Sequence, residues 1–191
     1  MDASNIFDYF SSKNFTFSKE IISRYFLSLR TKPFVILTGI SGTGKTKIAQ
    51  IFSDYMCQHL SDDEKNERIA FVSVRPDWMD NRGLLGFYNL ITDRYVTEKI
   101  LRLLMRAENV PENPFFVILD EMNIAKVEYY FSDFLSLMES RTHDRPKGEP
   151  LILHNQGRAI EPSDNKEPIP ERLHIPPNVF FTGTVNVDET T

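Results

Sequence analysis

The feature that most constrains the fold is a glycine-rich octapeptide placed between an apolar run and an amphipathic stretch. It matches the pattern G-x-x-x-x-G-K-[ST] and consists of Gly39, Ile40, Ser41, Gly42, Thr43, Gly44, Lys45 and Thr46. Glycines let backbone N–H groups turn inward around phosphate oxygens, and a helix that begins near Lys45 adds its positive N-terminal end. We expect Lys45 to reach the β- and γ-phosphates and the Thr46 hydroxyl to coordinate Mg²⁺. The octapeptide therefore predicts a site for the phosphates of a nucleotide.

The rest of the chain alternates between apolar runs and amphipathic stretches, which predicts an α/β fold with a mainly parallel sheet. The apolar runs expected to form strands cover residues 34–38, 69–74, 115–119 and 178–184. Helical spacing of apolar residues predicts helices over residues 6–29, 45 to about 60, 97–107 and 127–140. The run 34–38 is short and rich in β-branched residues, as expected of a strand buried on both faces.

The sequence also predicts the local structure of three segments that connect these elements. Residues 61–64 are a serine followed by three acidic residues, and they are expected to form a solvated loop. Residues 75–95 are rich in Gly, Asp and Asn, which favours an irregular, exposed segment. Its aromatic side chains either grip a polymer or a neighbouring subunit, or pack this segment onto the domain. The turn-forming sequence Asn155-Gln156-Gly157 lies between two short apolar stretches and predicts a β-hairpin.

A second motif is the pair Asp120 and Glu121, which directly follows the apolar run 115–119. The carboxyl ends of parallel strands line the active crevice of such folds, so both carboxylates are expected near the glycine-rich loop. Asp120 is expected to hold Mg²⁺ through its water shell, and Glu121 to orient and activate an attacking water. Asn186 follows the fourth apolar run. It is either a contact to the γ-phosphate or the attacking water, or a turn residue.

Composition narrows the function classes. Lys and Arg total 22 against 27 for Asp and Glu, and this net charge of −5 argues against direct nucleic-acid binding by this segment. Cys57 is the single cysteine, so an internal disulfide and a thiol-based metal site are excluded. No stretch approaches the roughly 20 apolar residues of a membrane span, and the N-terminus lacks the regions of a signal peptide. A cytoplasmic protein is the expectation.

Four stretches together resemble the AAA+ module of the McrB family, the NTP-driven motor subunit of methylation-dependent restriction systems. They are PFVILTGISGTGKTKIAQ (33–50), VRPDWMDNRGLLGFYN (74–89), FFVILDEMN (115–123) and FFTGTVNVDETT (180–191). The resemblance implies a three-layer αβα P-loop domain over residues 33–191, after a helical linker at 1–32. It implies the sheet order 5-1-4-3-2, with the fifth strand and the helical lid absent, and a possible β-hairpin insertion before the sensor strand. The run 34–38 is then expected to be an exposed sheet edge.

The same resemblance assigns roles to residues. Residues 39–46 are the Walker A loop, with Lys45 as a catalytic residue, Asp120 and Glu121 are the Walker B pair, and Asn186 is the sensor asparagine. Family members assemble into rings, usually hexamers, and act with a nuclease subunit, while DNA is bound by regions outside this chain. GTP preference is a hallmark of McrB, but residues 187–191 depart from the stretch associated with it. Both ATP and GTP stay open as substrates.

The leading hypothesis is binding and hydrolysis of a nucleoside triphosphate, with Mg²⁺, as the core of a McrB-like ring motor. The isolated chain is expected to be weak or inactive as an enzyme, because the arginine finger of the family pattern is missing. An alternative is a chaperone-like or scaffold module resembling MoxR proteins, which binds nucleotide with little or no turnover. A stand-alone P-loop kinase is disfavoured, because no acceptor-substrate site is recognisable. Glu121 favours hydrolysis over the scaffold alternative.

Overall fold

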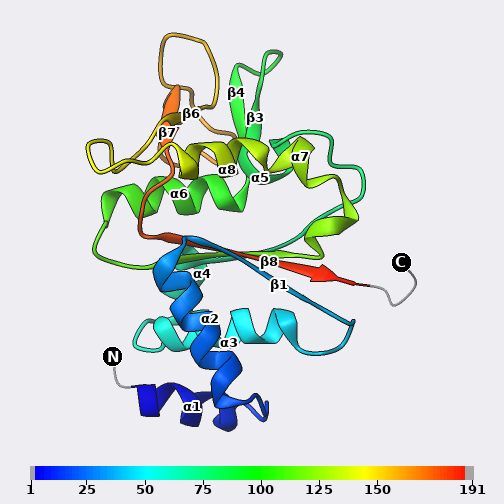
Figure 1. Ribbon diagram of the computed structural model, residues 1–191. Helices are drawn as coiled ribbons and strands as arrows, with labels where there is room; N and C mark the ends of the chain where they lie inside the picture. Colours follow the sequence, from blue (N-terminus) through cyan, green and yellow to red (C-terminus); the bar gives the residue numbers. More distant parts are fainter. Residues whose placement is uncertain (1–2, 188–191) are drawn as a thin grey trace. The chain divides into compact units, whose positions relative to one another are not determined.

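The computed structural model describes residues 3–187, with side chains from Ile6 onward, and Figure 1 shows the path of the chain. The described residues fall into two units. The first, here called the sheet unit, holds residues 3–74, 114–123 and 180–187. The second, here called the hairpin unit, holds residues 75–113 and 124–179. Among the described residues, no helix is both long and apolar enough to cross a membrane.

The sheet unit is built on a four-stranded sheet with the order β1-β8-β5-β2. Its strands are β1 (Phe34–Gly39), β2 (Ile69–Ser73), β5 (Phe115–Asp120) and β8 (Val179–Asn186). Strand β1 pairs in parallel with β8, and β2 pairs in parallel with β5. This is the 1-4-3-2 part of the expected order, and the predicted α/β fold class is confirmed.

Strand β1 lies at one edge of this sheet, and within the described residues its only strand partner is β8. The expectation that residues 34–38 are buried on both faces is wrong, because the side chain of Ile36 is 48% exposed. The central strand β5 shows the contrast, since its residues from Phe115 to Leu119 are all buried. An edge strand has a neighbour on one side only, so an apolar sequence does not by itself secure burial.

Four helices belong to the sheet unit: α1 (Ala3–Ser12), α2 (Lys19–Thr31), α3 (Lys45–Met56) and α4 (Asp62–Arg68). The single helix expected over residues 6–29 is wrong. The chain turns at Asn14, whose φ is 61°, and α2 restarts where the Ser18 side chain accepts a hydrogen bond from the N–H of Ile21. The solvated loop expected at residues 61–64 is also wrong, because Ser61 and Glu64 form a capping box that begins α4.

The core of the sheet unit lies where α2 and α3 cover one face of the sheet (Figure 1). Phe52 of α3 contacts Tyr25 of α2 and Phe116 of β5, with ring centroids 5.1 Å and 6.0 Å apart. Helix α1 adds Phe10 to the same cluster, and Cys57 is buried within it. The first two helices thus share the core of the sheet, while the domain boundary expected near residue 33 stays a prediction.

The hairpin unit contains four helices and two small antiparallel pairs of strands. The helices are α5 (Arg82–Leu85), α6 (Lys99–Asn109), α7 (Val127–Tyr130) and α8 (Ser132–Glu139). The pairs are β3 (Gly86–Asn89) with β4 (Arg94–Thr97), and β6 (Pro150–Ile152) with β7 (Arg172–His174). The single helix expected over residues 127–140 is interrupted at Phe131, whose φ of −123° is not helical.

Two expectations about this unit need correction. Residues 75–95 are not irregular throughout, because they contain α5, β3 and the start of β4, and Leu84 and Tyr95 are buried. The packing alternative holds for Trp78, whose ring lies 5.3 Å from that of Tyr130. The sequence Asn155-Gln156-Gly157 does not close a hairpin, since β6 pairs with the distant β7. An antiparallel pair of strands therefore does precede the sensor strand β8, but it is formed by β6 and β7 and not by the two stretches that flank residues 155–157.

Candidate functional site

The glycine-rich octapeptide connects β1 to α3, and its backbone has the conformation that the sequence demands. Gly42 and Gly44 have φ values of 79° and 84°, in the left-handed region that favours glycine. Helix α3 begins at Lys45, and its N-cap Gly44 supplies no side-chain hydrogen bond to the first turn. The free N–H groups of that turn are suited to bind an anion.

The Lys45 ammonium folds over the same loop. Its Nζ donates hydrogen bonds to the backbone carbonyls of Gly39 at 2.9 Å and Ile40 at 2.7 Å. A phosphate oxygen carries a negative charge, so its hydrogen bond with the ammonium gains a Coulomb attraction that a neutral carbonyl does not offer. A phosphate that reaches the loop therefore competes well with these carbonyls for the ammonium. The lysine side chain lies over the loop, and its expected contact with the phosphates stays a prediction.

Asp120 lies at the end of β5 and contacts the first turn of α3. The Thr46 hydroxyl donates to Asp120 Oδ1 at 2.6 Å, and the Thr184 hydroxyl donates to the same oxygen at 2.8 Å. The residues fit Mg²⁺, which prefers oxygen ligands and is usually held by one or two carboxylates, waters and substrate phosphates. Within residues 3–187 there is no cluster of three or more His, Cys, Asp and Glu side chains suited to a metal.

Glu121 and Asn186 are brought together at the same end of the sheet. The Asn186 side-chain amide donates to Glu121 Oε1 at 3.0 Å; Glu121 is exposed and Asn186 is half-buried. Asn186 is the last residue of β8, paired in register with Gly39, rather than a residue past the strand as expected. Glu121 has a φ of 54°, which is rare for a residue with a side chain. Such outliers concentrate at functional sites.

The model of the AAA domain (dynein-related subfamily) matches residues 34–186. The chain belongs to this AAA domain family. The matched range includes the octapeptide, both carboxylates and Asn186, so every residue that the sequence predicted for the site lies inside the AAA domain.

A curated relative adds a closer likeness. Over 159 residues the chain is 28% identical to the type IV methyl-directed restriction enzyme EcoKMcrB subunit of Escherichia coli strain K12. The alignment covers 83% of this chain and 31% of that protein, so the chain spans less than a third of its relative's length. The resemblance to a McrB-like AAA+ module is confirmed. Residues 188–191, which belong to the stretch bearing on the choice between ATP and GTP, lie outside the described residues.

Two residues of the AAA domain site were missed by sequence reasoning. Thr184 contacts Asp120 and also accepts a hydrogen bond from the N–H of Glu121 at 3.0 Å. Asn123, in the 3₁₀ turn η1 (Met122–Ile124), donates to the backbone carbonyl of Asn186 at 3.1 Å. A signal for Thr184 was present, because side chains two apart on a strand share a face, and Thr184 lies two residues before Asn186.

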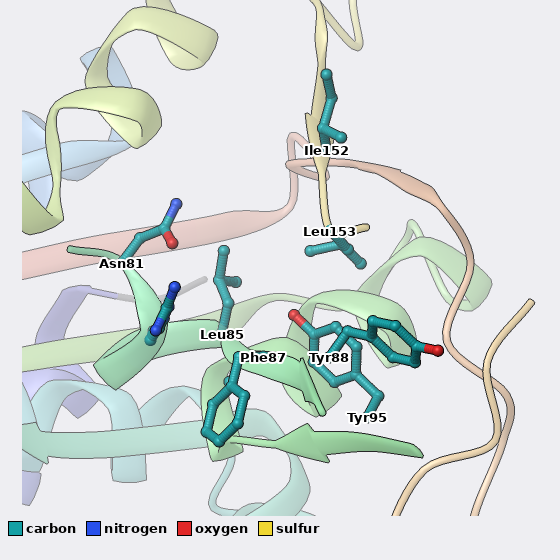
Figure 2. A pocket seen from close by; sticks show the side chains of 9 residues that line it. Asn81, Leu85, Phe87, Tyr88, Tyr95, Ile152 and Leu153 are labelled. Carbon is teal, nitrogen blue, oxygen red and sulfur yellow. The ribbon is translucent and has the colours of Figure 1, made fainter. Parts of the chain in front are cut away.

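The AAA domain also contains a pocket in the hairpin unit, shown in Figure 2. It measures about 250 Å³ and is lined by α5, β3, β4 and β6, with Leu85, Tyr88 and Tyr95 among its residues. No carboxylate lines it, and Arg82 is its one charged side chain. Burial raises the pKa of Tyr95 to about 12, so this phenol stays protonated at neutral pH. The lining of the pocket therefore offers no carboxylate base, unlike the site that contains Asp120 and Glu121.

Proposed function

We propose that this AAA domain binds a nucleoside triphosphate, ATP or GTP, with Mg²⁺, and hydrolyses it when it is part of a larger assembly. The observation that carries the proposal is the 2.6 Å hydrogen bond between Thr46 and Asp120. This bond joins the first turn of the helix after the glycine-rich loop to the carboxylate at the end of β5. A hydroxyl and a carboxylate beside a phosphate-binding loop are the donor set that a Mg²⁺–nucleotide complex requires.

Each residue has a distinct role in this proposal. The N–H groups of residues 39–46 and the Lys45 ammonium bind the phosphates, and Thr46 and Asp120 hold Mg²⁺. Mg²⁺, when bound, neutralises charge that develops on the phosphate oxygens during the reaction. Glu121 orients a water molecule and accepts its proton, and Asn186 holds the Glu121 carboxylate in place.

The wider role that we propose is that of a motor core. The likeness to the McrB subunit supports a homo-oligomeric ring, usually a hexamer, with nucleotide between subunits. In such a ring a neighbouring subunit supplies an arginine finger, which is worth several orders of magnitude in rate. A nuclease subunit and DNA-reading regions outside this chain complete the proposed restriction system. Alone, the chain is expected to bind nucleotide and to turn it over slowly.

The proposal is tested by calorimetric titration of the chain with Mg²⁺ complexes of non-hydrolysable ATP and GTP analogues. We expect saturable binding of at least one analogue, and Lys45→Ala is expected to weaken it on the order of 10- to 100-fold, because charge-assisted hydrogen bonds are lost. Lys47→Ala is the matched control, since Lys47 lies in the same turn but donates to Gln50 instead. Its affinity should stay close to that of the wild type.

The titration has informative alternatives. The analogue that binds more tightly identifies the preferred base. No binding of either analogue by the folded chain, or equal binding by Lys45→Ala, contradicts the proposal. Binding without turnover in the complete assembly would favour the scaffold role over the motor role.

A further inference from the structure

Thr184 occupies a position between the two carboxyl residues that the proposed function uses. It lies on β8, and its side chain is 2% exposed. Its hydroxyl donates to Asp120 Oδ1 at 2.8 Å and accepts a hydrogen bond from the N–H of Glu121 at 3.0 Å. One buried oxygen atom thus joins the metal-binding residue to the backbone of the residue that orients water.

The direction of these bonds follows from the number of available protons. A hydroxyl has one proton and two lone pairs, whereas an ionised carboxylate only accepts and a backbone N–H only donates. The Thr184 proton therefore goes to Asp120, and a lone pair is left for the N–H of Glu121. The three groups satisfy one another without water, and a satisfied network of this kind, centred on a buried hydroxyl, restricts the groups that it joins.

Both neighbours of Thr184 need this support. Asp120 Oδ1 accepts from Thr46 and Thr184 together, and within residues 3–187 no side chain donates to Oδ2. The two donors therefore select the oxygen that faces the protein and leave the other one for the water shell of a metal ion. Glu121 has a φ of 54°, a strained conformation that persists only where its surroundings hold it.

We propose that Thr184 is a positioning residue that couples the metal-binding carboxylate to the water-orienting glutamate. The inference rests on the proposed function and extends it to a residue for which the sequence motifs assign no role. Residues that orient a metal ligand through hydrogen bonds typically contribute 10- to 100-fold to metal affinity or activity. Thr184 acts indirectly, because it contacts Asp120 and not the metal ion.

The competing explanation is that Thr184 only packs the sheet. Thr182 provides the comparison, because it lies two residues earlier on β8 and is also buried. Its hydroxyl forms a hydrogen bond with the Tyr25 hydroxyl at 2.7 Å and does not contact the site. Replacing either threonine by valine keeps the shape of the side chain and removes one hydroxyl. A packing role predicts the same consequence at both positions.

The test measures nucleotide affinity by calorimetry, in Mg²⁺ and in EDTA, for the wild-type chain, Thr184→Val, Thr184→Ser and Thr182→Val. We expect the wild type to bind more tightly in Mg²⁺ than in EDTA. For Thr184→Val, the ratio of the affinity in Mg²⁺ to the affinity in EDTA should be about tenfold smaller than for the wild type, because only the affinity in Mg²⁺ falls. Thr184→Ser keeps the hydroxyl and should keep the gain, as should Thr182→Val.

The outcomes separate this inference from the proposed function. If the wild type binds in Mg²⁺ and Thr184→Val shows the same gain, the inference is overturned while the proposed function stands. Equal losses in Thr184→Val and Thr182→Val overturn it as well, in favour of packing. No binding by the wild type overturns the proposed function and the inference with it. Circular dichroism establishes that each variant is folded, and Thr184→Ala replaces Thr184→Val if the latter is not.

Discussion

The side-chain amide of Asn186 donates a hydrogen bond to Glu121 Oε1 at 3.0 Å, across the end of the sheet from β8 to the residue after β5. Asn123 donates in turn to the backbone carbonyl of Asn186 at 3.1 Å. An exposed carboxylate samples several rotamers unless a partner restricts it. The amide of Asn186 therefore sets the direction in which Glu121 presents its oxygens.

Replacing Asn186 by alanine tests this relationship. We expect nucleotide affinity to stay near the wild-type value and turnover in the complete assembly to fall about tenfold, because one neutral-to-charged hydrogen bond is lost. Glu121→Gln, which removes the general base itself, should lower turnover more, by a factor on the order of 10² to 10⁴. Steady-state hydrolysis assays measure both. A turnover rate unchanged in Asn186→Ala contradicts the role given to this amide.

Gly44 and Gly42 offer a matched pair in the glycine-rich loop. A Cβ on Gly44 would lie 2.9 Å from Phe17 Cζ, whereas a Cβ on Gly42 would meet no atom within 4 Å. Both residues have positive φ, so alanine at either position costs about 1–2 kcal/mol of backbone energy. Gly44→Ala must also displace the Phe17 ring, which packs against Phe10. In urea unfolding, Gly44→Ala should therefore be the less stable variant, and equal losses at the two positions would refute the steric argument.

Asp54 joins three elements of the sheet unit and makes stability depend on pH. Burial alone raises the pKa of Asp54, but hydrogen bonds from Tyr9, Lys65 and Lys13 outweigh it and lower that pKa to about 2. The donor atoms lie at 2.6, 2.9 and 2.9 Å. A pKa below the unfolded value of 3.8 means that the ionised form stabilises the fold. This contribution is present above about pH 4 and is lost as the pH falls toward about 2.

The corresponding variant is Asp54→Asn. We expect a loss of about 1 kcal/mol of unfolding free energy at neutral pH, a modest value because solvent screens these partly exposed ion pairs. Urea titrations of wild type and variant at several pH values measure the difference. It should shrink as the pH falls from about 4 toward 2. Asp144→Asn, at an exposed position, is the control, and a difference that stays constant with pH would rule out this linkage.

The capping box of α4 is testable in the same way. The N–H of Ser61 donates to Glu64 Oε2 at 3.0 Å, and the Ser61 hydroxyl accepts from the N–H of Glu64 at 3.4 Å. Ser61→Ala should cost about 1 kcal/mol in unfolding free energy, whereas Ser61→Asp keeps an acceptor and should cost much less. Chemical denaturation distinguishes the two. Similar losses in both variants would mean that the hydroxyl does not cap the helix.

The parts of the structure that sequence reasoning predicted well are encoded locally. Strand β1, the glycine-rich loop and the start of α3 follow one another within residues 34–56, and Asp120 ends β5 with Glu121 directly after it. Each of these patterns is complete in a short window. The order of the strands in the sheet came from the resemblance to a family, since no local pattern specifies which strands pair.

The predictions that were wrong concern features that depend on contacts between distant residues or on single backbone angles. The break between α1 and α2 rests on the left-handed Asn14, while apolar residues such as Phe15 and Phe17 continue past it and mimic a longer helix. The turn signal at residues 155–157 was outweighed by pairing between β6 and the distant β7. Thr184 reaches Asp120 only once the sheet has formed, so a local pattern could suggest its face but not its partners.

The central claim is that the glycine-rich loop and Asp120 together form a Mg²⁺–nucleotide site. A crystal structure of the chain with Mg²⁺ and a non-hydrolysable nucleotide analogue tests it most directly. We expect the phosphates to lie within residues 39–46, beside Lys45, and the metal ion to lie near the Thr46 hydroxyl and Asp120. A nucleotide bound elsewhere, such as in the pocket beside Tyr88 and Tyr95, with the loop free of phosphate, would contradict the claim.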